Sequence, residues 1–227
     1  MSEKLSPTEP QWRRRKADRP GEITEAALAC FVERGFAATR LEDVAKRAGV
    51  TKGTLYLYFP NKAELFKAVV RETILPNITR AEALVESSSA PARKVLALLL
   101  TEWSKGIMTP ASSIPKIVLA EAGNFPEITR FYFDEVINRG RQQFRRVLQS
   151  GMQSGEFRTM DVERTIDCIV GPMLLTMLWQ HSFYPVTGQA IDANALCRTL
   201  LDILAHGLAP GEPMPQSLDQ PEVGAAK

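Results

Sequence analysis

The stretch that decides the fold is residues 39–65, TRLEDVAKRAGVTKGTLYLYFPNKAEL. Thr39 and Glu42 have the spacing of a capping box, in which the hydroxyl accepts from a backbone amide and the carboxylate reaches back. The pattern predicts a short helix over residues 40–47. Gly49 follows this helix, and a glycine there permits a tight turn.

A second short helix is predicted directly after the turn. Thr51 is a good N-terminal cap for a helix of about seven residues, 52–58, and Pro60 ends it. Asn61 and Glu64 have the spacing of a second capping box, which opens a long helix. Two short helices joined by a tight glycine turn, the second led by a hydroxyl residue, are the layout of a helix-turn-helix.

The helix over residues 52–58 has dimensions suited to DNA. Seven residues rise about 10 Å, close to the major-groove width of about 12 Å. The first turn presents unpaired amides and the positive end of the helix dipole, which can hold a phosphate. Gly53 lets the backbone approach closely, whereas Leu55 and Phe59 point into the domain core. We expect DNA contacts from Thr39, Thr51, Lys52, Gly53, Thr54, Tyr56, Tyr58 and Lys62.

Each of these residues also has an ordinary structural interpretation. The threonines and Asn61 are good caps whatever else they do. A tyrosine at helical spacing is more often half-buried packing than a recognition residue. A lone lysine such as Lys62 is commonly a solvated charge. The occurrence of caps, glycine turn and short helix in one order favours DNA contact in addition to packing.

Residues 38–65 resemble the DNA-binding domain of the tetracycline-repressor (TetR/AcrR) family of one-component bacterial regulators. The segments AGVTKGTLY (48–56) and YFPNK (58–62) are highly specific, and the resemblance runs from about residue 23 to residue 70. The rest of the chain is similar only in helix count and length. The resemblance implies a homodimeric, sequence-specific regulator, usually a repressor, that binds its operator through the helix over 52–58. It also implies release from DNA by a small molecule that enters the helical domain.

Charge and composition agree with a globular protein that binds a polyanion. Hydrophobic residues make up 44% of the 227 and charged residues 24%, which excludes disordered, collagen-like and coiled-coil chains. Residues 1–62 hold twelve Lys and Arg against eight Asp and Glu, whereas residues 63–210 are balanced. This excess fits a nucleic-acid surface, but an excess of four is modest, so charge alone favours a solvated, slightly basic surface and the case for nucleic acid rests on the spacing of the motifs.

Apolar residues recur three and four apart almost throughout, which predicts an all-α fold. We expect four parts: a disordered basic N-terminal arm over 1–18, a three-helix helix-turn-helix domain over 19–66, a larger helical ligand-binding and dimerisation domain over 67–208, and a flexible tail over 209–227. Helices are expected over 20–34, 40–47, 52–58, 62–87 with a bend at Pro76, 91–105, 114–122, 126–154, 161–181 and 192–207.

The N-terminal arm ends in the basic block Trp12-Arg13-Arg14-Arg15-Lys16. Such a block can enter the minor groove beside the operator. A solvated tail that adds only nonspecific affinity is an equally good interpretation. The sequence leaves open whether residues 1–16 touch DNA.

The predicted helix over 161–181 is apolar around too much of its circumference to face water. One side can be covered by its own domain, and a partner subunit best supplies the other. Together with the helix over 192–207 it would form a four-helix bundle across a two-fold axis. In the alternative, a monomer, this helix is simply central.

A pocket for the small-molecule effector is expected within the C-terminal helices. Sparse polar groups such as Asn138, Thr176 and His181 could orient the ligand. For each apolar residue, ordinary core packing competes with ligand contact. The candidate lining residues are Trp103, Met108, Phe125, Phe131, Met173, Met177 and Trp179.

Other classes of protein find little support in the sequence. Three cysteines and two histidines lack the spacing of a disulfide framework or a zinc site, so we expect no metal and no cofactor. No nucleophile–base arrangement or phosphate-binding glycine loop indicates an enzyme. The longest apolar run, Val95–Leu100, is too short to span a membrane, and we expect a cytoplasmic protein on the bacterial nucleoid. A constitutive or architectural DNA-binding protein without an inducer is the alternative.

Overall fold

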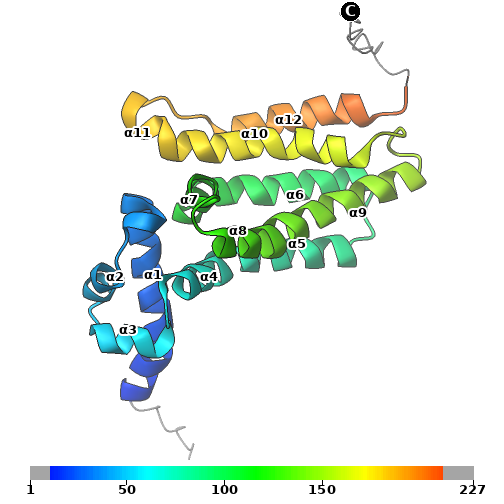
Figure 1. Cartoon of the computed structure of the whole chain (residues 1–227). Coiled ribbons are helices and arrows are strands. Elements are labelled where there is room, and N and C mark those ends of the chain that lie inside the picture. The colour runs from blue at the N-terminus through cyan, green and yellow to red at the C-terminus, as the bar shows by residue number, and fades with distance from the viewer. Residues whose placement is uncertain (1–10, 212–227) are drawn as a thin grey trace, which may run out of the picture.

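The structure, a computed structural model, describes the backbone of residues 11–211 and the side chains of residues 19–211. Over residues 11–211 all regular elements are helices and there is no strand (Figure 1), which confirms the all-α prediction. In chain order they are α1 (Gln11–Ala38), α2 (Leu41–Arg47), α3 (Lys52–Tyr58), α4 (Lys62–Thr73), α5 (Leu75–Ser87), α6 (Ala92–Ile107), the 3-10 turn η1 (Pro110–Ser113), α7 (Ile114–Glu121), α8 (Pro126–Tyr132), the π-helical segment η2 (Phe133–Asn138), α9 (Arg139–Gln153), α10 (Val162–Ser182), α11 (Tyr184–Thr187) and α12 (Ala193–Leu208).

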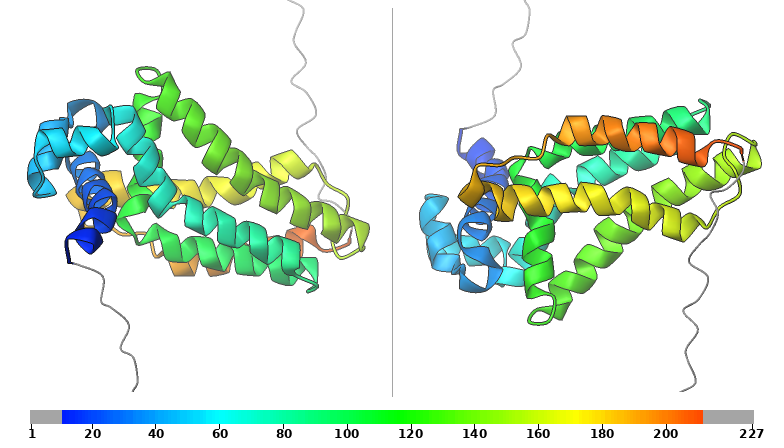
Figure 2. Two further views of the ribbon diagram at one scale, coloured as in Figure 1. Left: turned by 90° about the horizontal axis from the view of Figure 1, so that it is seen from below. Right: turned by 90° about the horizontal axis from the view of Figure 1, so that it is seen from above.

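A small unit of α1, α2 and α3 lies at one end of a longer helical bundle (Figure 1). α4 leaves this unit and leads into α5, which runs along the bundle beside α9. α10 and α12 lie antiparallel and side by side as an outer layer, as the views from two directions show (Figures 1 and 2). The helix-turn-helix unit therefore lies at the end of the bundle, with α3 at its outer edge.

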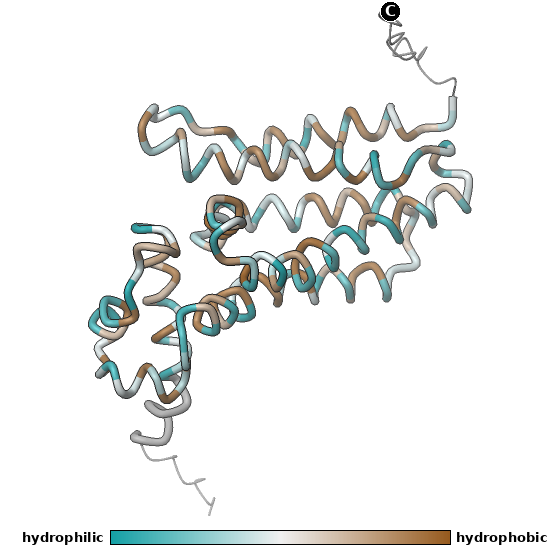
Figure 3. The backbone as a smooth tube through the Cα atoms, in the orientation of Figure 1, coloured by the Kyte–Doolittle hydropathy of each residue, from teal (hydrophilic) through white to brown (hydrophobic). Residues whose placement is uncertain are grey.

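Two apolar cores hold these parts together. The first core joins α1–α4 to residues of α7, α8 and η2, and the second joins α6, α9, α10 and α12. Figure 3 shows apolar residues interspersed with polar ones along the long helices, as one-sided burial requires. Because the first core takes residues from α7 and α8, the helix-turn-helix unit is packed directly against the bundle.

α1 begins at Gln11, earlier than the predicted start near Pro20. Residues 11–18 were expected to belong to the disordered arm, but their backbone is helical and forms the start of α1. Residues 1–10 of the predicted arm lie outside the described residues. The segment is rich in Gln, Arg, Lys and Ala, which favour helix. The helix runs through Pro20, which the sequence placed in its first turn, at the cost of one backbone hydrogen bond.

The bend predicted at Pro76 is confirmed as a break between α4 and α5. Ile74, with φ −107° and ψ −47°, separates the two helices, and Pro76 stands in the first turn of α5. A proline there cannot donate a backbone hydrogen bond to α4, so the helix cannot run straight through. The predicted domain boundary at residues 66–67 falls inside α4, which is therefore shared by both parts.

The remaining predicted helices are present with small shifts at their ends. The helix expected over 126–154 is formed by α8, η2 and α9 in succession, and its middle six residues are wound as a π-helix. The four-residue elements η1 and α11 were not expected. Single turns of this length carry too little apolar periodicity to be recognised.

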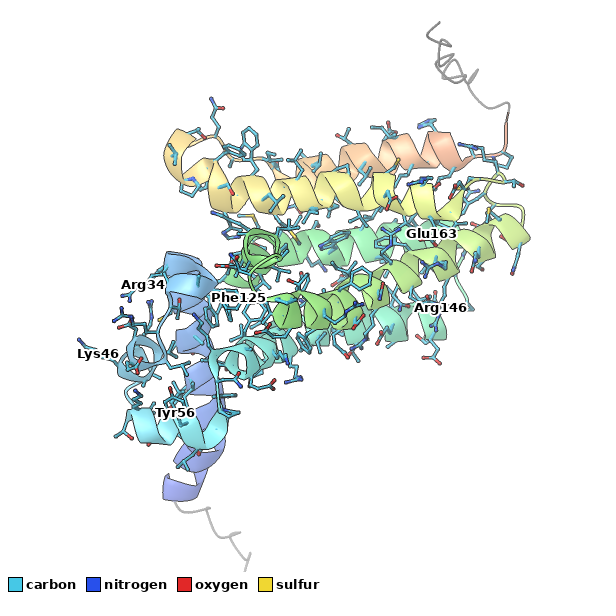
Figure 4. The ribbon with its side chains drawn as sticks, viewed as in Figure 1. Arg34, Lys46, Tyr56, Phe125, Arg146 and Glu163 are labelled. Atoms are coloured by element: carbon cyan, nitrogen blue, oxygen red, sulfur yellow. The ribbon has the colours of Figure 1, made fainter. Side chains whose placement is uncertain are left out.

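A close joint connects the helix-turn-helix unit to the bundle. The ring centroid of Phe36, at the end of α1, lies 4.7 Å from that of Phe125, which precedes α8 (Figure 4). The amide of Ala37 donates to Oε1 of Glu121 in α7 at 3.0 Å, and Glu121 is buried. This joint fixes the orientation of α1, and with it that of α3, relative to the bundle.

Candidate nucleic-acid interface

The turn between α2 and α3 has the predicted glycine geometry. Gly49 has a φ of 65°, in the left-handed region that glycine adopts readily. Its amide donates to the carbonyl of Lys46 at 3.2 Å. The amide of Val50 donates to the carbonyl of Ala45 at 3.0 Å, and Val50 packs against the first core. These bonds fix the angle at which α3 leaves α2.

Two of the predicted caps are confirmed. Thr51 Oγ1 accepts from the amide of Thr54 at 3.1 Å at the start of α3. Asn61 Oδ1 accepts from the amide of Glu64 at 2.8 Å at the start of α4. Because each cap leaves other first-turn amides without a helical partner, the N-terminus of α3 retains donors for an anion.

One face of α3 is buried and the opposite face is exposed. Leu55 is fully buried in the first core. At about 100° per residue, positions two before and two after it lie on the far side of the helix, and these are Gly53 and Leu57. Both are exposed, as are Lys52 and Tyr56 on the flank (Figure 4). Thr51 is also exposed, and Thr54 and Tyr58 are half-buried. Lys52 and Tyr56 therefore lie on one flank of the outward side of α3, and Thr54 and Tyr58 lie on the other flank.

Lys52 forms an ion pair with Glu42 of α2, and its ammonium lies 5.8 Å from the ring centroid of Tyr56. The Lys52 hydrogen bond lowers the pKa of the Glu42 carboxyl, and the same bond raises the pKa of Lys52. Both side chains are exposed, so the pair contributes little to stability. Lys52 is thus a charged group held at the exposed surface and available to exchange Glu42 for another anion.

The capping box predicted at Thr39 is wrong. Arg40 is the N-cap residue of α2, and its side chain makes no capping bond. Thr39 is buried, and its hydroxyl donates to the carbonyls of Gly35 at 2.7 Å and Cys30 at 3.2 Å. The chain turns at Gly35, which brings the end of α1 within reach of Thr39. The Thr39 side chain therefore ties α1 to α2 and does not face the exposed surface in this structure.

Lys62 also bonds within the domain. Its ammonium donates to the carbonyls of Phe36, Ala37 and Thr39 at 2.7, 2.8 and 3.0 Å. It lies 4.7 Å from the ring centroid of Phe36 and 5.8 Å from that of Phe125. Partial burial lowers the pKa of Lys62. The side chain predicted to hold a phosphate is instead placed where three carbonyls at the end of α1 converge.

Two exposed residues beside these candidates were missed in the sequence. Arg40 is exposed at the start of α2, and no ion pair among the described side chains involves it. A basic residue beside the expected helix start could have indicated it. Leu57 is exposed on α3, although a leucine two residues after one buried residue, Leu55, and two before another, Phe59, is ordinarily assigned to a core.

The structure does not bring the seven predicted effector-binding residues around one cavity. Phe125 and Phe131 pack against the first core, and Trp103 packs against the second. Met173 and Met177 are buried members of the second core, whereas Met108 is exposed. Trp179 donates through its indole N–H to the carbonyl of Gln189 at 2.7 Å. Among the polar candidates, His181 Nε2 lies 2.7 Å from the hydroxyl of Ser112.

An open groove of about 410 Å³ lies between α5 and α9. Arg139 within it is paired with Glu82 at 2.8 Å, whereas Arg146 is exposed and forms no ion pair among the described side chains (Figure 4). Gln143 is buried, and its Oε1 has no hydrogen-bond donor within the described part of the chain. The groove is lined by Glu82, Glu86, Asn138, Arg139, Gln142, Gln143 and Arg146.

Features of other classes of site are few in residues 11–211. Within that range no helix is both long and apolar enough to cross a membrane. No three His, Cys, Asp or Glu side chains of the same range are grouped as metal ligands would be. All three cysteines are free; Cys30 and Cys197 are buried and Cys168 is exposed.

Comparison with known protein families identifies the family to which this helix-turn-helix geometry belongs. Residues 23–69 match the family described as bacterial regulatory proteins, tetR family, and residues 91–199 match the tetracyclin repressor-like C-terminal domain. The chain belongs to the TetR family. The first match covers the later part of α1, all of α2 and α3 and most of α4, and the second spans α6 to the middle of α12. Both parts of the fold are therefore TetR-like.

Individual relatives agree along most of the chain. The HTH-type transcriptional repressor KstR2 of Mycobacterium tuberculosis is 28% identical over 192 residues, which are 84% of this chain and 95% of KstR2. The solved structure of KstR2 has a TM-score of 0.67 at 25% identity, covering 85% of this chain and 96% of that one. FadR of Bacillus subtilis, solved with stearoyl-CoA, has a TM-score of 0.69 at 26% identity and covers 83% of this chain and 98% of its own.

TetR membership makes the chain a DNA-binding transcriptional repressor with an N-terminal helix-turn-helix and a C-terminal ligand-binding domain. These relatives are transcriptional regulators. The α3 surface and the α5–α9 groove both offer exposed polar groups to such partners.

We expect Lys62→Ala to lower the free energy of unfolding by about 1.5–3 kcal/mol, since it removes a charged donor from three carbonyls. Urea unfolding followed by circular dichroism measures this loss. Lys105→Ala is the control, because Lys105 pairs with Glu102 on the exposed surface of α6, and its loss should cost less than about 0.5 kcal/mol. Equal stability of the two variants would contradict the structural role of Lys62.

The same Lys62 variant bears on its predicted phosphate contact. If Lys62 keeps its carbonyls when DNA binds, the slope of log affinity against log salt stays unchanged. A slope smaller by about one would mean that Lys62 leaves the carbonyls for a phosphate in the complex.

Proposed function

We propose that the protein is a repressor that binds a palindromic operator as a homodimer, through α3 of each subunit, and that a small-molecule effector releases it. Its place of action is the nucleoid in the bacterial cytoplasm. The observation that carries the proposal is the exposed surface of α3, a seven-residue helix capped by Thr51 whose outward side bears hydroxyl, ammonium and phenol groups beside a glycine.

The chemistry of this surface fits a duplex. The α3 N-terminus offers amides to a phosphate, and Gly53 allows the backbone to come close to the base edges. Lys52 and Arg40 supply positive charge on two sides of the turn. The proposed contact residues are Arg40, Thr51, Lys52, Gly53, Thr54, Tyr56 and Tyr58, with Thr39 and Lys62 supporting the unit from within.

Gly53→Ala tests the close approach without disturbing the free protein. A Cβ at Gly53 would meet only Thr51 Oγ1, at 3.8 Å, which is an ordinary contact. Alanine also stabilises a helix more than glycine does, so the free energy of unfolding should stay equal or rise by about 0.5–1 kcal/mol. Operator affinity should nevertheless fall roughly tenfold, the effect of about 1.4 kcal/mol. The operator is first obtained by selection from random duplexes, and affinity is measured by fluorescence anisotropy.

Gly106→Ala is the matched control for this experiment. A Cβ at Gly106 meets nothing within 4 Å, and the residue lies in α6, away from α3. The control should show a similar gain in stability with unchanged operator affinity. If Gly53→Ala binds the operator as tightly as the control does, α3 does not approach the duplex at this position.

The outer layer of α10 and α12 supports the homodimer. In the described part of the chain no helix covers the outer side of this layer (Figure 2). Leu175 of α10 is 54% exposed and Ile203 of α12 is 61% exposed. Leu200 and Leu204 of α12 are buried in the second core. Two copies of this layer would bury the exposed residues as a four-helix bundle.

Leu175→Glu combined with Ile203→Glu should produce a monomer, because two buried carboxylates in each subunit would face each other across the two-fold axis. Light scattering during size-exclusion chromatography should report one chain where the wild type gives two, with an unchanged circular dichroism spectrum. Operator affinity should fall with the mass, because one short helix makes few contacts.

Ile137→Glu, an exposed apolar position on η2, is the control and should stay dimeric. If the double variant still has the mass of a dimer, the interface lies elsewhere. If the wild type has the mass of a monomer, the protein is not the proposed homodimer.

The α5–α9 groove supports an effector with a polar, anionic head. Arg146 offers a positive charge, and Gln143 Oε1 can accept from an N–H or O–H of a ligand. The ring centroid of Phe144, the residue after Gln143, lies 6.0 Å from that of Trp103 in the second core. We propose that an apolar tail of the effector would enter this core. Because FadR was solved with stearoyl-CoA, a long-chain acyl-CoA is the first effector to test.

We expect stearoyl-CoA, below its micelle concentration, to stabilise the free protein and to weaken the operator complex by linkage. At 100 times its Kd the stabilisation should be about 2.7 kcal/mol, measured by thermal unfolding. Gln143→Leu should reduce this stabilisation, whereas Gln149→Leu on the exposed side of α9 should not.

Free coenzyme A and stearate test the head and the tail separately. Binding of either one alone with full release from DNA would show that the other half is dispensable. A compound that stabilises the protein without weakening the operator complex is not the effector, and a panel in which none does both would favour a regulator without an inducer.

A further inference from the structure

Leu57 stands out from the rest of the α3 surface. It is 85% exposed, and only Val186, at 86%, is as exposed among the large apolar side chains of the described residues. It belongs to neither apolar core of that part of the chain. A leucine left in water forgoes the favourable burial that its side chain normally has, so its place on α3 is not explained by the stability of the free protein.

The geometry of α3 points Leu57 toward whatever the helix binds. Leu57 lies on the side opposite the buried Leu55, and Gly53, one turn earlier on the same side, has no side chain. Leu57 is therefore the foremost side chain of the second turn. The polar groups of Lys52 and Tyr56 lie to one side of it, where they can reach the backbone of a duplex.

The chemistry of a leucine side chain restricts what it can recognise. It can neither donate nor accept a hydrogen bond, so it cannot read the donor and acceptor pattern of base edges. The apolar group that the major groove presents is the C5-methyl of thymine. Resting on the proposed function, we propose that Leu57 selects for thymine by contact with this methyl group, once in each half of the operator.

Replacing thymine by deoxyuridine removes the methyl group and leaves every hydrogen bond of the base pair in place. In the operator selected by the wild-type homodimer, each thymine is replaced in turn, symmetrically in both half-sites, and Kd is measured at fixed salt. At one position the wild type should lose about fourfold in affinity per half-site, the equivalent of one buried methyl group. The two half-sites together should lose about fifteenfold.

Leu57→Ala completes a double-mutant cycle. This variant should bind the operator more weakly than the wild type, and it should no longer distinguish thymine from deoxyuridine at that one position. Discrimination at all other positions should persist. Because Leu57 is exposed, thermal unfolding should be unchanged, so a folding defect cannot imitate the result.

Val186→Ala is the matched control, an equally exposed apolar residue on α11 at a distance from α3 (Figure 1). It should keep the full wild-type pattern. The inference is overturned if no deoxyuridine substitution weakens wild-type binding, if the penalty persists in Leu57→Ala, or if selection yields an operator without thymine. A wild type that selects no sequence at all would instead overturn the proposed function, and this inference with it.

Discussion

The position of α2 and α3 depends on the packing of three phenylalanine rings in the first core. The centroids of Phe31, Phe36 and Phe66 lie 5.5–5.6 Å apart in all three pairs, and each ring is almost fully buried. Phe36 reaches this position because Gly35, with a φ of 78°, lets the chain turn at the end of α1. The same turn sets the positions of α2 and α3, so the orientation of α3 depends on how these three rings pack.

This cluster continues into the bundle, which gives the ligand-binding part a physical route to α3. Phe125 packs on Phe36, Glu121 accepts from the amide of Ala37, and Lys62 donates to three carbonyls around them. An effector can release DNA only if it favours one arrangement of this joint over another. Since buried rings and a buried carboxylate repack in discrete steps, a small shift of α7 or α8 would reorient α1 as a unit.

The sequence predicts the helix caps and the glycine turn because these depend on neighbouring residues. It does not predict side-chain bonds that depend on how the folded chain packs. The caps at Thr51 and Asn61 and the turn at Gly49 depend on residues within five positions, so spacing alone indicates them. Thr39 fits a cap equally well by spacing, but its hydroxyl donates backward to the carbonyls of Gly35 and Cys30 at the end of α1. Lys62 was read as a phosphate ligand because its partners lie more than twenty residues away. The effector candidates were apolar residues at helical spacing, a pattern that cores and pockets share.

The composition of the α3 surface explains why a repressor of this kind would need two subunits. Lys52 is paired with Glu42, so in the proposed complex it would have to exchange this carboxylate for a phosphate or base. Gly53 brings no side chain, and Leu57 offers apolar contact only. Each subunit thus commits few hydrogen bonds to bases, and each good bidentate pair discriminates by only about 1–3 kcal/mol. Doubling these contacts across a two-fold axis raises specificity without changing the length of α3, and the exposed layer of α10 and α12 is the surface that can hold the two copies in register.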